Sequence, residues 1–191
     1  MKKLLGILVL SLFLITPSQA DDIQDFQIEG MSIGDSLLDY FSEEKILNNR
    51  AHYFKNKTYT PVEIDEESFE IYDSVQFGYK TGDKNYIILG LAGNIDYPDN
   101  IKHCYKKMDE IVTELTKLFK NTARITEKKT MIQTIDKPGD TKKVSVAYWF
   151  DSKDVVVAAC YDYSEESGYM DNLAVSVDTK EYNDFLGIAY K

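Results

Sequence analysis

The spacing of apolar residues alternates along the chain between a helical and a strand-like period. The longest helical pattern covers residues 101–121, where apolar side chains recur at steps of three and four: Ile101, Cys104, Tyr105, Met108, Ile111, Val112, Leu115 and Phe119. This spacing predicts one amphipathic helix with a single apolar stripe. A shorter stripe over residues 33–46 predicts a first helix.

Strand-like segments lie on both sides of the long helical pattern. Residues 69–80 and 85–95 flank the turn at 81–84, and residues 144–150 and 155–163 flank the turn at 151–154, so two hairpins are expected. Residues 172–178 are predicted to form a further strand. The pattern of residues 129–135 is consistent with a strand, and that of residues 51–65 with a loop or a short strand. The last segment, 180–190, is consistent with a helical turn or a strand.

This order of elements predicts an α+β domain. We expect an antiparallel sheet of about five strands, packed on one long amphipathic helix, with a short N-terminal helix. Cys104 lies on the apolar face of the predicted helix and Cys160, 56 positions later, lies in a predicted central strand. A disulfide between them would tie helix to sheet and stabilise the fold by about 4 kcal/mol.

The first twenty residues resemble a targeting segment. Lys2 and Lys3 precede an apolar run at 4–15, and small residues lead up to Ala20. This pattern predicts a signal peptide over residues 1–20, cut between Ala20 and Asp21, and a single α+β domain over residues 21–191. A membrane anchor is the alternative, but the run is short for a bilayer. No cysteine stands at the cut for a lipid anchor. We therefore expect a periplasmic or secreted protein without a membrane span in the mature chain.

Composition restricts the partners. Without Lys2 and Lys3 the chain has 20 basic residues against 32 acidic ones, a net charge of −12. Such a chain repels nucleic acid and anionic lipid, so neither is expected as a partner. The even cysteine count of an exported protein favours the Cys104–Cys160 pairing over two free thiols. The acidity favours solubility first, and a cationic ligand or metal ion second.

Gly34-Asp35-Ser36-Leu37 resembles the nucleophile block of the GDSL esterases and lipases. The resemblance implies a hydrolase with Ser36 as nucleophile. That chemistry needs a histidine base, which those families carry near the C-terminus, and no histidine follows His103. The structural interpretation has Ser32 capping a helix, with Asp35 completing a capping box at the positive end of the dipole. We expect Ser36 in the first turn of a helix.

Gly30-Met31-Ser32 ahead of a helix resembles the opening of outer-membrane-assembly lipoproteins and β-lactamase-inhibitor-like modules. That resemblance implies a protein-binding role. The lipid-bearing cysteine of the lipoproteins is absent here, and the resemblance covers about a dozen residues. As a whole, the chain resembles small exported Gram-negative proteins of unknown function.

No catalytic or metal-binding set assembles from the sequence. His52 and His103 stand alone, without the paired spacing of a zinc site, and no calcium-loop motif is present. Carboxylates at 65–67, 151–154 and 162–166 read as solvated turn residues. We expect no catalytic residues, no metal site and no cofactor, and we favour a non-enzyme over an enzyme.

Aromatic residues are concentrated in the second hairpin. Fourteen tyrosines are present in all, and we predict a binding face formed by the following residues: Tyr148, Trp149, Phe150, Tyr161, Tyr163 and Tyr169. Cross-strand packing is the alternative. The sequence thus predicts an exported protein that binds another cell-envelope protein. A periplasmic small-ligand carrier is the alternative, and a serine hydrolase using Ser36 the lesser one.

Overall fold

The computed structural model describes residues 23–98, 100–132 and 141–189. The expected signal peptide over residues 1–20 lies outside these residues, and so do residues 136–140, whose sequence Asp-Lys-Pro-Gly-Asp predicts a turn. The helices are α1 (Glu43–Asn48), α2 (Ile101–Phe119) and α3 (Lys180–Ala189), with short 3₁₀ turns η1 (Ile23–Asp25), η2 (Leu37–Asp39) and η3 (Glu165–Ser167). The strands are β1 (Tyr59–Ile64), β2 (Ser74–Lys80), β3 (Gly90–Asp96), β4 (Ala123–Ile125), β5 (Lys129–Ile132), β6 (Lys142–Phe150), β7 (Val155–Asp162) and β8 (Asn172–Asp178).

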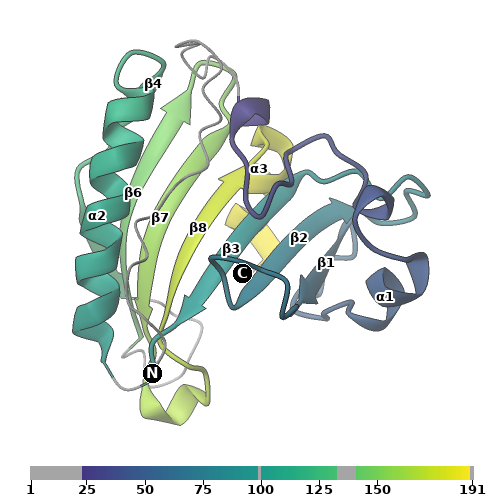
Figure 1. The fold of residues 1–191 in the computed structure, drawn as a ribbon, viewed down its shortest axis with the longest axis horizontal. Helices are drawn as coiled ribbons and strands as arrows, with labels where there is room; N and C mark the ends of the chain where they lie inside the picture. The colour runs from purple at the N-terminus through teal and green to yellow at the C-terminus, as the bar shows by residue number, and fades with distance from the viewer. Residues whose placement is uncertain (1–22, 99, 133–140, 190–191) are drawn as a thin grey trace.

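All eight strands form one antiparallel sheet in the order β1-β2-β3-β8-β7-β6-β4, with β5 also paired to β6 (Figure 1). The α+β class and the antiparallel sheet are therefore confirmed, whereas the expected number of about five strands is too small. β8, the last strand along the chain, lies between β3 and β7 at the middle of the sheet. Within the described part of the chain, no helix is long and apolar enough to cross a membrane.

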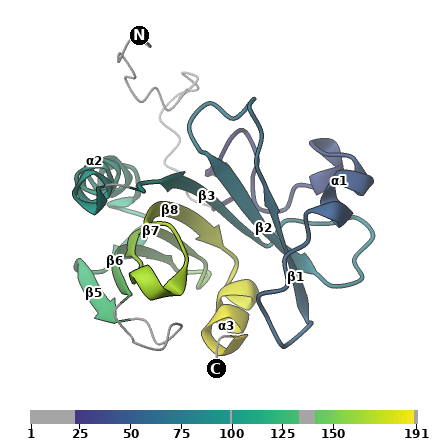
Figure 2. The same ribbon diagram turned by 90° about the horizontal axis from the view of Figure 1, so that it is seen from below.

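The two faces of the sheet are covered differently. α2 and the N-terminal segment pack on one face, and α3 packs on the other (Figure 2). The larger core lies on the α2 side, because the buried residues of α2 pack against alternate residues of the strands. Val146 on β6, Ala158 on β7 and Val175 on β8 are examples, and they are register partners across the three strands. Alternation along each strand then directs the intervening side chains to the opposite face.

The long helix agrees with its predicted span and its apolar stripe. Cys104, Met108, Ile111, Leu115 and Phe119 are its buried residues. Asn100 caps its N-terminus by accepting a hydrogen bond from the Lys102 N–H. The predicted disulfide joins Cys104 to Cys160 on β7, across a sequence separation of 56.

The prediction of one helix over residues 33–46 is wrong, because only residues 43–46 are α-helical, as the first part of α1. Residues 34–37 instead hydrogen-bond to residues 86–88 like a short strand, and Gly34 adopts a φ of +94° that no helix allows. Ser36 then caps η2, and Ser42 caps α1. One hydrogen bond of the expected capping box is present, because Asp35 Oδ2 accepts from the Ser32 N–H at 2.9 Å. Pairing across the fold overrides the helical spacing here.

A second, smaller core lies under α3, on the face opposite α2. It consists of Phe54, Tyr59, Tyr182 and Phe185. The Tyr182 ring lies directly over Gly78 and Gly90, where an added Cβ would come within 2.1 Å of ring carbons. Two glycines on neighbouring strands therefore make the space in which α3 docks.

Candidate functional site

The structure separates the six predicted binding residues into three groups. Tyr148 and Phe150 point into the core and are 0% and 6% exposed, so the prediction of an exposed position is wrong for these two. The Tyr148 hydroxyl donates to the Val112 carbonyl on α2 and hydrogen-bonds Thr116, each at 3.0 Å. Strand alternation explains the error, because Val144, Val146, Tyr148 and Phe150 share one face and Trp149 lies on the other.

Trp149 lies on the face opposite α2, which we call the open face. The open-face residues of the central strands are mostly small, including Ala147 on β6, Val157 on β7 and Ser176 on β8, which are register partners. Trp149 is at one end of this face, beside Val155, and Lys143 and Tyr161 are at the other. Trp149 is six positions along β6 from Lys143, roughly 20 Å, so Trp149 is remote from Tyr161 and the other tyrosines of the predicted face.

Tyr161, Tyr163 and Tyr169 come together in what we call the tyrosine stack. The rings of Tyr161 and Tyr163 are stacked at a centroid distance of 5.7 Å and an interplanar angle of 15°. The Tyr169 ring contacts Tyr163 at 5.3 Å. Tyr169 is 63% exposed and its neighbour Met170 49% exposed, so the stack ends in a prominent apolar surface.

Hydrogen bonds hold the loop that carries the stack. The Tyr163 N–H donates to Asp171 Oδ1 at 2.7 Å, and the Ser164 N–H donates to the Thr141 hydroxyl at 3.1 Å. The η3 turn ends at Gly168, whose φ of 71° reverses the chain toward Tyr169. The aromatic rings are thus presented from a tethered loop next to β7 and β8.

The surroundings of the stack are mainly acidic. Glu165 and Glu166 on η3 are exposed, and Asp162 and Asp171 flank the loop. Burial raises the pKa of the Asp171 carboxyl, and the nearby Asp162 adds to that rise, whereas the hydrogen bond from Tyr163 opposes it. Lys142 lies 3.9 Å from Asp162, and the Lys143 ammonium lies 5.0 Å from the centre of the Tyr161 ring. The Lys143 contact shows that these rings can accept a cation.

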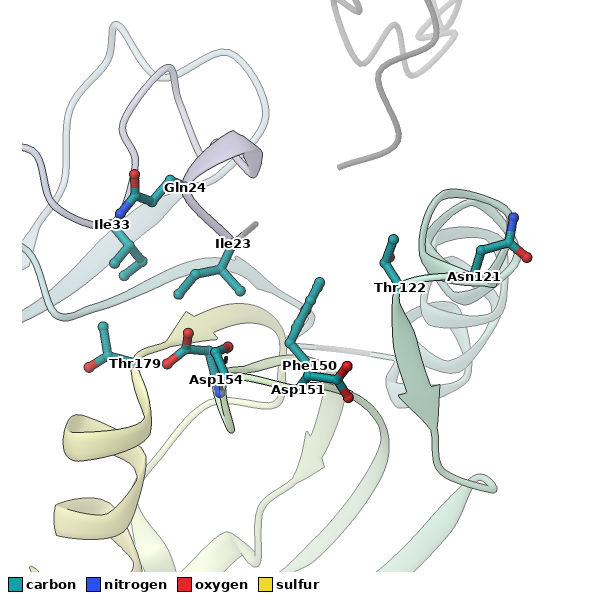
Figure 3. Close-up of a pocket in the computed structure, with 10 residues that line it drawn as sticks. Ile23, Gln24, Ile33, Asn121, Thr122, Phe150, Asp151, Asp154 and Thr179 are labelled. Atoms are coloured by element: carbon teal, nitrogen blue, oxygen red, sulfur yellow. Dashed lines mark hydrogen bonds between the residues drawn. The ribbon is translucent and has the colours of Figure 1, made fainter. Parts of the chain in front are cut away.

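A hollow of about 470 Å³ lies at the far end of the sheet from the stack (Figure 3). It is bounded by Ile23 and Ile33 of the N-terminal segment, by Asn121 and Thr122 after α2, and by the β6–β7 turn at 151–154. The two aspartates of that turn, Asp151 and Asp154, both line it. From the sequence alone both aspartates are predicted to be solvated turn residues, because the hollow forms only when the N-terminal segment packs beside the turn.

The Ser36 hydroxyl has a structural role. It donates to the Asn85 carbonyl at 2.6 Å and accepts from the Leu38 N–H at 3.2 Å. His52 and His103 are both exposed, and His103 contacts Asn100. Among the residues that the structure describes, no three His, Cys, Asp or Glu side chains are grouped to hold a metal ion.

Asp178, which the sequence did not single out, is a buried carboxyl group on the open face. It is 7% exposed, next to Gly90 and the Tyr182 ring, and Ser176 donates to it at 3.4 Å. Burial raises the pKa of Asp178 to about 7, and the hydrogen bond from Ser176 and the charge of Lys143 lower it less. By alternation Asp178 belongs to the polar side of β8, so only the docking of α3 explains its burial.

Comparisons of this chain with protein-family models, with curated proteins and with solved structures found no match.

Proposed function

We propose that this protein is exported and binds another protein of the cell envelope through the tyrosine stack. The proposal is carried by the tyrosine stack itself, in which the rings of Tyr161, Tyr163 and Tyr169 contact one another. The stack ends at the exposed side chains of Tyr169 and Met170. Tyrosine supplies large contact area and a polar tip at low conformational cost, and for this reason it is enriched at protein interfaces. Export is supported by the N-terminal sequence pattern and by the disulfide.

The partner segment carries arginine or lysine side chains. The stack is bordered by exposed Glu165 and Glu166, and the whole chain has a net charge of −10. A basic segment would satisfy these carboxylates and place cations against tyrosine rings. An acidic partner would meet like charge at the same place. Charge complementarity therefore selects a basic segment as the occupant.

The experiment places a photoreactive amino acid at position 169 of the exported protein, and at position 53 as a control. The partner captured at position 169 is then purified, and its Kd is measured for the wild type, Tyr169→Ala and Tyr53→Ala. Tyr53 is a matched control because it is also an exposed tyrosine, on another part of the surface.

We expect Tyr169→Ala to weaken binding at least tenfold, because removing a central aromatic anchor at an interface costs about 2 kcal/mol or more. Tyr53→Ala should change the Kd by less than twofold. Added salt should weaken the wild-type complex, since the proposed contact is partly ionic. Equal affinities of wild type and Tyr169→Ala, or equal capture at both positions, would rule out the stack as the binding surface.

A further inference from the structure

α3 is attached to the open face by a few contacts of its own (Figure 2). A single residue, Thr179, joins it to β8, and the Thr179 N–H and hydroxyl both donate to the Leu89 carbonyl at 2.9 Å. The buried residues of the helix, Tyr182 and Phe185, belong to the smaller core and not to the larger one. The contacts that hold α3 can therefore break while the larger core stays closed.

Asp178, the last residue of β8, is a carboxyl group buried under this helix. It is 7% exposed, and among the described residues its side chain accepts one hydrogen bond, from the Ser176 hydroxyl at a long 3.4 Å. The first N–H of α3, at Lys180, donates to Asp154 and not to Asp178. A buried carboxylate needs several donors or a paired cation to offset its lost hydration, and this position supplies neither.

The carboxyl group and the Tyr182 ring share one small space above Gly90. A Cβ built on Gly90 would lie 2.1 Å from Tyr182 Cδ1 and 2.8 Å from Asp178 Oδ1, so both groups occupy the position that a side chain would otherwise fill. The same ring lies over Gly78, with its hydroxyl oxygen 2.4 Å from a Cβ built there. Docking of α3 therefore puts the Tyr182 ring where water would otherwise hydrate Asp178.

The charged groups around Asp178 do not compensate it at short range. Its register partners on β3 and β7 carry no charge. On β6, the Lys143 charge lowers the pKa of Asp178, but burial raises it more, to about 7. On α3, Tyr182 is the titratable group beside the carboxyl group, and Lys180 pairs with Asp184. The docked position of the helix thus favours the neutral form of Asp178.

We propose that α3 is a pH-dependent switch, which stays docked on the open face while Asp178 is protonated and opens locally when Asp178 loses its proton to water. Opening hydrates the carboxylate, removes the Tyr182 ring from Gly78 and Gly90, and exposes the aromatic side chains of the smaller core. α2 and the larger core stay folded. The switch does not depend on the proposed partner binding.

The direction of the pH dependence follows from the two states of the helix. The pKa of Asp178 is about 7 in the docked state, and it is near the ordinary value of about 4 once the group is hydrated. Docking is therefore strongest below about pH 4 and weakens as pH rises through about 7. Between these values the ratio of open to docked molecules should rise about tenfold per pH unit, and it should level off above about pH 7.

Amide hydrogen exchange of the mature protein, corrected for the intrinsic rate at each pH, measures this opening. The amides of Phe185 and Leu186 report on α3, and those of Ile111 and Val112 report on α2. We expect the protection factors of the α3 amides to fall about tenfold per unit between about pH 5 and about pH 7. Low urea should leave α3 exchange unchanged, because local opening exposes little surface, and should accelerate α2 exchange. Equal urea dependence at both helices would show that α3 opens only with the whole fold, and would overturn the proposal.

Asp178→Asn tests the assignment of the switch to this carboxyl group, because asparagine stays neutral at every pH. The α3 protection factors of this variant should not change with pH. Asp184→Asn is the matched control, since Asp184 is an exposed aspartate of the same helix, and it should keep the wild-type pH dependence. A pH-dependent α3 in Asp178→Asn, or a pH-independent α3 in the wild type, would contradict the switch. The wild-type profile decides by itself if the variant does not fold.

Discussion

Among single residues, Asp178 departs most from what a surface strand would carry. It ends β8 on the polar side of the strand, yet α3 covers it and Tyr182 lies beside it. Its register partners are Gly90 on β3 and Val155 on β7, neither of which has a charge to offer. Among the described residues, Lys143 on β6 is the one cation whose charge lowers the pKa of Asp178. The carboxyl group is therefore most stable when neutral.

Asp178 makes stability depend on pH with a definite sign. Its folded pKa of about 7 is above the ordinary value near 4, so the neutral group's contribution to stability is complete below about pH 4 and is lost as pH rises through about 7. Asp178→Asn stays neutral. The free energy of unfolding of this variant, relative to wild type, should therefore increase from pH 4 to pH 8, by more than about 1 kcal/mol.

Urea unfolding at several pH values measures this difference. Asp65→Asn is the control, because Asp65 is exposed and its variant should run parallel to wild type. Parallel curves for wild type and Asp178→Asn would show that folding does not raise the pKa of Asp178.

At the level of elements, the amphipathic spacing of α2 and the alternation of β6, β7 and β8 were sufficient to predict those segments. The periodicity is strong there because both the helix and the strands face one core. β4 spans three residues, too few for alternation to show, and β1 contains Pro61, which is tolerated because β1 is an edge strand. The 33–46 segment has helical spacing, but its residues 34–37 pair with residues 86–88, and local sequence does not encode this pairing.

The candidate sites were less predictable than the elements. Strand alternation over residues 143–150 assigns Tyr148 and Phe150 to the core face. The predicted binding face included them because they are adjacent to Trp149 in the sequence. The contact of Tyr169 with Tyr163 depends on the loop at 164–168, and the hollow depends on the N-terminal segment. These contacts join segments that are distant along the chain or lie on either side of an irregular loop. The spacing of apolar residues does not predict such contacts.

The docking of α3 gives a prediction at this scale. Gly90→Ala places a Cβ about 2.1 Å from Tyr182 Cδ1, so the ring must move and α3 must shift from the sheet. We expect a loss of roughly 2 kcal/mol in the free energy of unfolding, a typical cost of overpacking. In a Tyr182→Ala background the same substitution should cost much less. Chemical denaturation of the wild type, the two single variants and the double variant gives the coupling free energy, and additive effects would contradict the contact.

For the whole molecule, the disulfide connects the two layers of the larger core. Cys104 lies on α2 and Cys160 on β7, and the bond closes a loop between residues 56 apart in sequence. The helix and the sheet are thus covalently linked at one position in addition to their packing. A large part of the stability therefore depends on an oxidising environment.

Replacing both cysteines by alanine should lower the free energy of unfolding by about 4 kcal/mol, from the entropy of the closed loop. Guanidinium unfolding of the double variant measures this loss, and wild type kept in a reducing agent should behave like the variant. A midpoint that is the same with and without the reductant would show that the bond adds little to the fold.

The position of β8 affects how the chain can fold as it is made. β8 follows every other strand in sequence but separates β1, β2 and β3 from β4, β5, β6 and β7 in the sheet. A nascent chain that lacks residues 172–178 therefore has two unjoined half-sheets with open edges, which are prone to mispairing. Closure of the sheet must therefore wait until residues 172–178 have been made, so the order of synthesis opposes early completion of the native sheet.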